Sequence, residues 1–183
     1  SMTVGKTNRT VRFLGKKEVF EAPVVGQLAA ALGGIRVDRG TGSDAPIEAA
    51  LAALAAGEMV AIMPQGTIPR GRAFFDPALK GRWGAARLAV LAGAPVIPMG
   101  IWGTEKVWPR NSQVPMVWNV LRPPKVTITV GPEVALRRDG DAAALADENT
   151  QRMMSAISNL LPPQAREARE PTEAEIRSAL PSN

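Results

Sequence analysis

Residues 64–72 hold the side chains of this chain whose types and spacing could do chemistry. They read PQGTIPRGR, which brings together an amide at Gln65, a hydroxyl at Thr67 and guanidinium groups at Arg70 and Arg72. These groups supply hydrogen-bond donors and positive charge, and Gly66 permits close approach to the backbone. The pattern predicts a ligand-binding loop, and the alternative interpretation is a basic surface turn between two elements.

The elements around this loop would place it at the edge of a sheet. Residues 59–63 form an apolar run that is long enough for a buried strand and too short for a helix. The prolines and glycines of residues 64–72 then forbid regular structure, so the strand has to end in a shaped loop. In open α/β sheets, ligands bind at the carboxyl ends of the strands, which is where this loop would lie.

Composition narrows the classes of function. The chain has 183 residues, which fits one domain, and it contains neither cysteine nor histidine, so disulfides, thiolate nucleophiles and imidazole chemistry are excluded. The net charge of +5 predicts an anionic partner, but the few aromatic residues and the lack of tyrosine argue against nucleic acid. No apolar run reaches the roughly 20 residues of a membrane span and no secretory signal is visible, so we expect an intracellular, soluble or peripheral protein.

Apolar periodicity predicts strands and helices in alternation along the chain. Strands are expected at residues 11–14, 35–39, 59–63, 94–101 and 125–130. Helices are expected at residues 19–32 in two pieces broken at Pro23, at 43–57 with Ser43 as N-cap, at 82–92 as a buried alanine-rich helix, and around 153–161.

This alternation predicts a single α/β domain over residues 11–161, with a largely parallel or mixed sheet flanked by helices. Residues 1–10 are polar and unpatterned, so we expect them to be frayed. Residues 162–183 are predicted to be a flexible charged tail. Within it, Thr172 and Glu175 have the spacing of a capping box, which allows a short helix over residues 172–180.

Three ordered blocks resemble the glycerolipid acyltransferase family, in particular the 1-acylglycerol-3-phosphate acyltransferases. The family's G-x-I-x-V-D-R block is matched by residues 33–39, and its F-P-E-G-T-R-S block by MPQGTIP at 63–69. Its V-P-V-I-P-V block is matched by APVIPM at 94–99, preceded by a GAARLA stretch at 84–89. The similarity spans residues 11–131 and implies a glycerol-3-phosphate acyltransferase-like fold.

The family's first block, H-x-x-x-x-D, is missing from this chain, which has no histidine. In the family, that imidazole takes the proton from a glycerol hydroxyl as the hydroxyl attacks an acyl thioester, and the Asp holds the ring. No other residue is identified as catalytic. The resemblance therefore implies either an N-terminally truncated acyltransferase, which we favour, or a pseudoenzyme that binds phosphate or lipid without catalysis.

The third block also departs from the family pattern. Its Glu is Gln65, its Arg is Ile68 and its Ser is Pro69, while Arg70 stands two positions beyond the lost guanidinium. The resemblance implies that Arg39 of the second block binds the acceptor's phosphate, and we expect Gln65, Gly66, Thr67 and Arg70 to join it. An ion pair of Arg39 with Asp38 or Asp44 is the alternative, as is simple turn chemistry for Gly66 and Thr67.

Other candidates are better explained as ordinary structure. Solvated surface accounts for the lysines and arginine that could extend a basic rim, namely Lys16, Lys17, Lys80 and Arg82. Core or loop anchoring accounts for the tryptophans that could sit at a lipid interface, namely Trp102, Trp108 and Trp118.

The expected function is acyl transfer from acyl-CoA or acyl carrier protein to a lysophospholipid at the cytoplasmic, inner face of the membrane. No metal or organic cofactor is implied, and no nucleic acid is expected as a partner. We also expect possible self-association, because a chain without the leading block would expose apolar surface around Phe13, Phe20 and residues 24–25.

Overall fold

The structure, a computed structural model, describes residues 9–21, 25–31, 33–37, 44–107, 109, 111 and 123–180. The chain divides into two compact units, one of Ser1–Pro64 with Trp83–Ala94 and one of Gln65–Arg82 with Pro95–Asn183. The main chain first passes from one unit to the other between Pro64 and Gln65, inside the predicted ligand loop. The single domain expected over residues 11–161 stays a prediction.

The first unit is built on a parallel sheet with β1 (Val11–Lys16) at its centre. β2 (Ile35–Val37) pairs with the second half of β1, with Leu14 opposite Ile35. β3 (Met59–Ala61) pairs with the first half, with Val11 opposite Met59. These strands lie where the apolar runs predicted them, and residues 38 and 39 of the expected second strand fall outside the described part of the chain.

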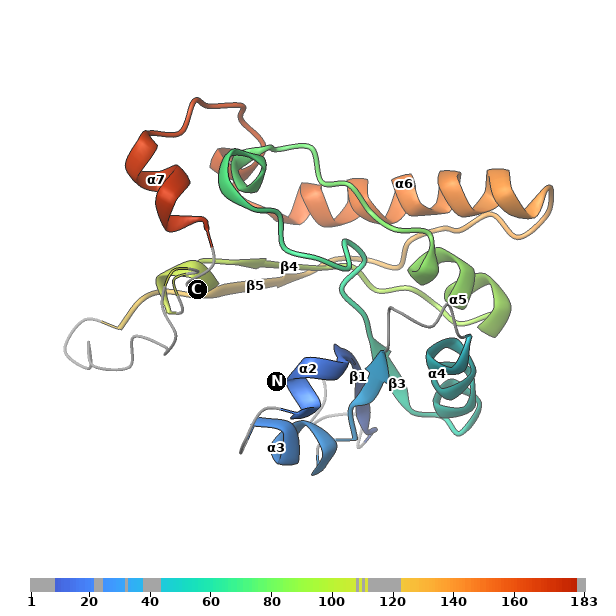
Figure 1. The fold of residues 1–183 in the computed structure, drawn as a ribbon. Coiled ribbons are helices and arrows are strands. Elements are labelled where there is room, and N and C mark those ends of the chain that lie inside the picture. Colours follow the sequence, from blue (N-terminus) through green and yellow to red (C-terminus); the bar gives the residue numbers. More distant parts are fainter. Residues whose placement is uncertain are drawn as a thin grey trace. The chain divides into compact units, whose positions relative to one another are not determined.

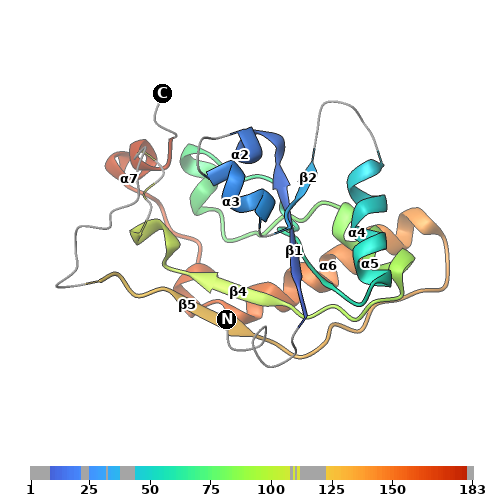
Figure 2. The same cartoon turned by 90° about the horizontal axis from the view of Figure 1, so that it is seen from below.

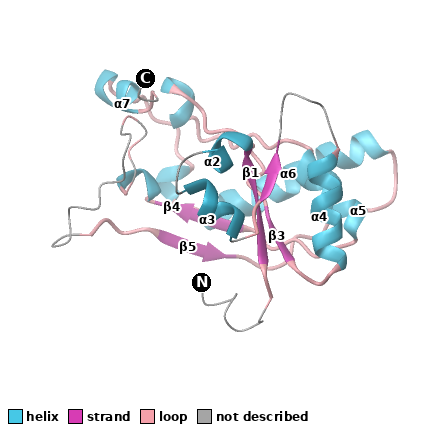
Figure 3. Ribbon diagram, turned by 60° about the horizontal axis from the view of Figure 1, so that its bottom comes forward, coloured by secondary structure: helices cyan, strands magenta, loops and turns pink. Residues whose placement is uncertain are grey.

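Helices cover both faces of this parallel sheet (Figures 1 and 3). α2 (Lys17–Glu21) and α3 (Val25–Ala31) lie on one face, and α4 (Ala45–Ala55) and α5 (Gly84–Ala92) lie on the other. Helix α4 contacts all three strands and α5. Alanine allows such close approach, and most of the buried residues of these two helices are alanine: Ala50, Ala85, Ala86, Leu88 and Ala89.

Two of these helices differ in detail from the sequence expectation. Helix α4 has Asp44 at its N-cap, without a capping hydrogen bond from the side chain, whereas Ser43 lies outside the described residues. Helix α5 buries one face only, because Trp83 at its start and Leu91 near its end are each 56% exposed. The expected burial of this alanine-rich helix is therefore confirmed for Ala85, Ala86, Leu88 and Ala89 but not for its outer face.

The second unit holds an antiparallel ribbon packed on a long helix. β4 (Met99–Trp102) pairs with β5 (Thr127–Val130), with Met99 opposite Val130. A Cβ placed on Gly100 would lie 2.9 Å from the Cβ of Leu160 in α6 (Ala142–Leu160), so the glycine lets helix and ribbon touch. The strand predicted at 94–101 begins only at Met99, because prolines at 95 and 98 donate no backbone hydrogen bond.

Short elements complete the second unit: η1 (Gly71–Phe75), η2 (Thr104–Lys106), η3 (Pro163–Ala165) and α7 (Glu173–Ser178). Thr172 begins α7 with the predicted capping box. Its hydroxyl accepts a hydrogen bond from the Glu175 N–H at 3.3 Å, and the Glu175 carboxylate accepts one from the Thr172 N–H at 2.9 Å. No helix among the described residues is long and apolar enough to cross a membrane.

Apolar side chains remain exposed in each unit. Phe13 is 53% exposed, while Phe20 is half-buried against Gly15. Val24 and the side chain of Val25 lie outside the described part, so self-association stays a prediction. On the ribbon, the face opposite Gly100 carries only apolar residues, which are 39% to 54% exposed: Met99, Ile101, Ile128 and Val130.

Candidate functional site

The loop leaves β3 without regular structure over residues 64–70, as its prolines and glycines predicted, whereas Gly71 and Arg72 already belong to η1. Gly66 has a φ of 69°, a left-handed conformation that favours glycine. Gln65 and Gly66 are half-buried, and Thr67 and Arg70 are exposed. The loop therefore combines a left-handed backbone turn with polar groups open to solvent, which fits a ligand-binding loop and also the alternative of a basic surface turn.

Arg82 lies directly against Gly66. A Cβ at position 66 would stand 3.0 Å from the Cδ of Arg82 and 3.3 Å from its Nε. The glycine thus serves both the backbone conformation and the approach of this arginine. Sequence reasoning assigned Arg82 to solvated surface. The structure leaves it exposed but places its side chain on the loop, a contact that no local pattern in the sequence indicates.

Arg70 and Arg82 have no ionic partner among the described residues, so their charges are available to a ligand. Between described residues, neither Arg70 nor Arg82 makes an ion pair or a side-chain hydrogen bond. Arg72, by contrast, pairs with the carboxylate of Glu170. The positive charge open to a ligand near Gly66 and Thr67 therefore comes from Arg70 and Arg82.

The end of the loop is held by the C-terminal part of the second unit, where η1 and α7 lie side by side (Figures 1 and 2). The N–H of buried Gly71 donates to the carbonyl of Ala179 at 3.3 Å, and a Cβ on Gly71 would stand 3.6 Å from Leu180. Arg169 lies 5.0 Å from the ring centroid of Phe75. Sequence reasoning missed this contact, because it assigned the segment to a flexible tail.

Arg39, the predicted phosphate ligand of the second block, lies outside the described residues. The structure does describe the residue that follows its loop. Arg87 of α5 donates to both carboxylate oxygens of Asp44 at 2.8 and 3.2 Å, and this pairing lowers the pKa of the Asp44 carboxyl. The carboxylate named as an alternative partner for Arg39 is therefore already bound on two oxygens.

A second ion pair, between Arg12 and Glu58, lies at the end of the parallel sheet where β1 and β3 begin. Arg12 of β1 donates to Glu58 at 2.6 and 2.8 Å, next to an open cavity of about 360 Å³ beside α4. The hydrogen bond from Arg12 lowers the pKa of the Glu58 carboxyl. Ligands bind at the carboxyl ends of parallel strands, whereas this pair lies where β1 and β3 begin, so its role is to fix the sheet.

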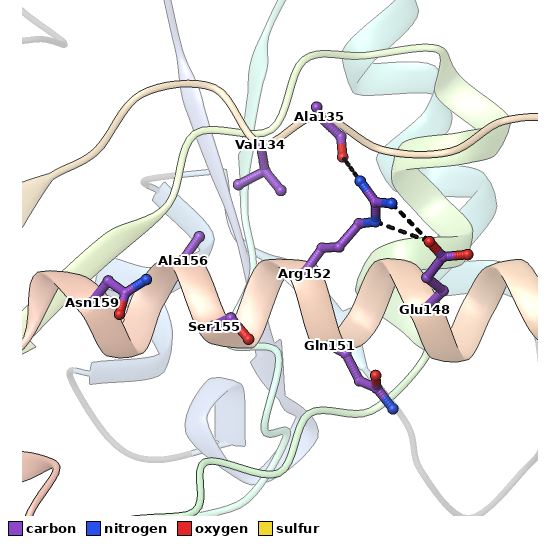
Figure 4. Close-up of a pocket in the computed structure, with 8 residues that line it drawn as sticks. All are labelled: Val134, Ala135, Glu148, Gln151, Arg152, Ser155, Ala156 and Asn159. Atoms are coloured by element: carbon purple, nitrogen blue, oxygen red, sulfur yellow. Dashed lines mark hydrogen bonds and ion pairs between the residues drawn. The ribbon is translucent and has the colours of Figure 1, made fainter.

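A groove of about 530 Å³ runs along α6 beside residues 134–135 (Figure 4). The side chain of Arg152 lies across it and donates to the carbonyl of Ala135 at 3.1 Å and to the Glu148 carboxylate at 2.7 Å. Fully buried Asn149 bonds both backbone groups of Arg137. These polar groups satisfy one another, and none of the predicted site residues lies here.

Metal binding has no support in the described part of the chain. No group of three or more carboxylate, imidazole or thiolate side chains there could hold an ion. The donors near Gly66 are instead N–H groups and a hydroxyl, which recognise anions rather than cations.

Comparisons with known proteins agree with the resemblance of the sequence blocks. Residues 1–102 match the model of the family described as Acyltransferase. Two curated relatives are the uncharacterized proteins Rv0502 of Mycobacterium tuberculosis (strain ATCC 25618 / H37Rv) and Mb0514 of Mycobacterium bovis (strain ATCC BAA-935 / AF2122/97). Each is 30% identical over 125 residues, which is 67% of this chain and 33% of the relative. The chain thus spans about a third of the length of these relatives.

A solved structure confirms the fold prediction. The 1-acyl-sn-glycerophosphate (LPA) acyltransferase PlsC from Thermotoga maritima aligns with a TM-score of 0.53 at 21% identity. The alignment covers 82% of this chain and 57% of PlsC. At this identity the likeness concerns the fold alone, an α/β fold with a parallel sheet flanked by helices.

Acid is predicted to loosen α7. The hydrogen bond from Arg169, supported by those from Thr172, lowers the pKa of Glu175 from 4.5 to about 2. The carboxylate therefore stabilises the folded segment above pH 4.5, and this contribution is lost as the pH falls from 4.5 towards 2. An NMR titration of the α7 amides should show fraying in that window. In Glu175→Gln the helix should already be weakened at neutral pH and should lose this pH dependence; an unchanged titration would contradict the assignment.

Proposed function

Because this chain belongs to the acyltransferase family, we propose that it carries the acceptor-binding site of an enzyme that acylates lysophospholipids. The acceptor is 1-acylglycerol-3-phosphate or a related lysophospholipid, and the acyl donor is acyl-CoA or acyl carrier protein. The observation that supports this proposal is the arrangement at Gly66, where a left-handed turn contacts the side chain of Arg82, while the same loop carries Arg70, which makes no ion pair with a described residue.

The chemistry of the loop suits a phosphate monoester. Such a group carries up to two negative charges and accepts several hydrogen bonds. Arg70 and Arg82 supply two positive charges, and Thr67 and the backbone near Gly66 supply neutral donors. Gln65, in place of the family's Glu, offers an amide without a negative charge, so nothing at that position repels the phosphate. Arg39 would add a further guanidinium.

Two candidate functions differ in whether the protein has a catalytic base. In acyl transfer, a base takes the proton of the acceptor hydroxyl while its oxygen attacks the thioester carbonyl, and the C–S bond then breaks to release the thiol. The family's base is a histidine, and this chain has none. The second candidate is therefore a phosphate- or lipid-binding module that keeps the anion site without catalysis.

A membrane surface is the proposed location of the acceptor. The net charge of +5 suits an anionic leaflet, such as the inner face of the cytoplasmic membrane. The apolar face of the ribbon, formed by Met99, Ile101, Ile128 and Val130, suits shallow contact with lipid. We infer a peripheral association that uses both features.

The first prediction from the proposed function is that the purified chain shows no acyl transfer from acyl-CoA or acyl carrier protein to lysophosphatidate above background. General-base catalysis typically contributes about 10² to 10⁴-fold, and the base is absent. A radiolabelled acyl-transfer assay measures this directly. Turnover by this chain would show that another residue acts as the base and would remove the case for a binding module.

The second prediction concerns the anion site. Replacing Arg39, Arg70 or Arg82 by Ala should each weaken binding of lysophosphatidate by about 1.5 to 3 kcal/mol, because a charged hydrogen bond to phosphate is lost. This corresponds to about a 10- to 150-fold rise in Kd by calorimetry. Arg166→Ala is the matched control, since it removes the same charge from an exposed position with no role in the loop. Equal affinities in all four variants would refute the site.

The third prediction concerns the membrane. The chain should co-sediment with vesicles that contain anionic lipid and should be largely released at 1 M salt, where screening shortens the Debye length to about 3 Å. Ile128→Glu should reduce binding several-fold, because it places a charge on the apolar face of the ribbon. Ala174→Glu adds the same charge at an exposed position of α7 and serves as the control. If both variants bind alike, this face does not contact lipid.

A further inference from the structure

We call the loop at residues 64–72 the anion loop and the segment at residues 163–180 the C-terminal clasp. The clasp makes several kinds of contact with the end of the anion loop. Its backbone accepts the hydrogen bond from Gly71, and the side chains of Ile176 and Leu180 lie over that glycine, 3.9 and 3.6 Å from where a Cβ would stand. Its charged residues reach the next turn through the pair of Glu170 with Arg72 and the stacking of Arg169 on Phe75.

The hydrogen bond from Gly71 fixes the peptide that follows Arg70. The N–H of Gly71 belongs to the peptide plane that starts at the carbonyl of Arg70, so holding this N–H holds the ψ of Arg70, which is 148°. Gly71 itself has a φ of 56° and is buried under the clasp. The backbone on the carboxyl side of Arg70 is therefore shaped by residues of the clasp rather than by the loop alone.

The ion pair between Arg72 and Glu170 affects which arginines are available to a ligand. Both partners are well exposed, at 64% and 85%, so the pair adds little to stability. Its effect is instead on the distribution of charge, because it places a carboxylate on the guanidinium of Arg72, whereas no described residue forms an ion pair with Arg70 or Arg82.

We propose that the C-terminal clasp is a positioning element for the anion loop. It fixes the peptide that follows Arg70 and removes Arg72 from the set of available cations, so that the loop presents two guanidinium groups to a doubly charged phosphate monoester. This inference rests on the proposed function and deepens it, because it names residues outside the family blocks, chiefly Ile176 and Glu170, on which acceptor binding depends.

The test uses the full chain with Ile176→Asp, which places a charge where α7 packs on Gly71. Ile176→Leu is the conservative variant that should restore the contact. Arg177→Gln changes the exposed neighbour on the same helix and is the control. Two quantities are measured at low temperature, where the chain is folded: the hydrogen-exchange rate of the Gly71 amide, and the Kd of a short-chain lysophosphatidate below its micelle concentration.

The expected result is an exchange rate at Gly71 at least 10-fold faster in Ile176→Asp, together with a Kd at least 5-fold higher. Ile176→Leu and Arg177→Gln should match the unmodified chain in both measurements. A merely structural role would lower the melting temperature and leave the Kd of the folded protein unchanged. If Ile176→Asp also loses protection along α6, it is unfolded, and the milder Ile176→Ala is used with the same expectations in direction.

The outcomes separate this inference from the proposed function. Faster exchange at Gly71 with an unchanged Kd overturns the positioning role and leaves the anion site intact. Slow exchange in Ile176→Asp shows that the clasp does not hold Gly71 and also overturns it. If the unmodified chain does not bind lysophosphatidate at all, the proposed function fails, and the positioning role fails with it.

A second substitution addresses the charge. Glu170→Ala frees Arg72 without touching the apolar contact, so the melting temperature should stay unchanged. The ratio of the Kd of lysophosphatidylglycerol, a phosphate diester, to that of lysophosphatidate should rise at least 3-fold, because a third free arginine attracts the doubly charged monoester more strongly than the singly charged diester. An unchanged ratio would refute the role of the ion pair.

Discussion

Parallel pairing of β1 with a neighbour on each side is the constraint on which the first unit depends. Parallel neighbours cannot be joined by a tight turn, so each connection has to cross a face of the sheet and carries helix with it. α2 and α3 make the first crossing and α4 makes the second, on the opposite face. The pair of Arg12 with Glu58 and the hydrogen bond from the Met59 N–H to Thr10 hold the strands in register where they begin.

The features that the sequence predicted are those encoded by neighbouring residues. β3 and its abrupt end follow from an apolar run beside prolines and glycines, and the start of α7 follows from Thr172 and Glu175 three positions apart. The resemblance to the family's ordered blocks also predicted the fold, because it indicates which strands pair, whereas periodicity indicates only where strands and helices occur. The position of Gly66 at a left-handed turn was likewise legible, since few other residues adopt that conformation.

The features that could not be predicted depend on residues far apart in the chain. An ion pair of Arg39 with Asp44 was an alternative interpretation of the sequence, but the Asp44 carboxylate binds Arg87 of α5, which lies 43 positions further along the chain. Residues 163–180 are rich in charge, a composition that favours a solvated tail, and nothing local indicates that Ala179 accepts a hydrogen bond from Gly71. Arg82 was similarly ambiguous, because an exposed arginine against a glycine has the same local pattern as one in solvent.

The contact between η1 and α7 has a consequence for biosynthesis. Arg72 and its partner Glu170 are separated by 98 residues, so the ribosome must add nearly all of the second unit before the turn after Arg70 can close. At about 5 to 20 residues per second, the delay is roughly 5 to 20 seconds. During that time Arg72 lacks the carboxylate that pairs with it in the folded protein. The loop's final form is thus among the last parts of this fold to be completed.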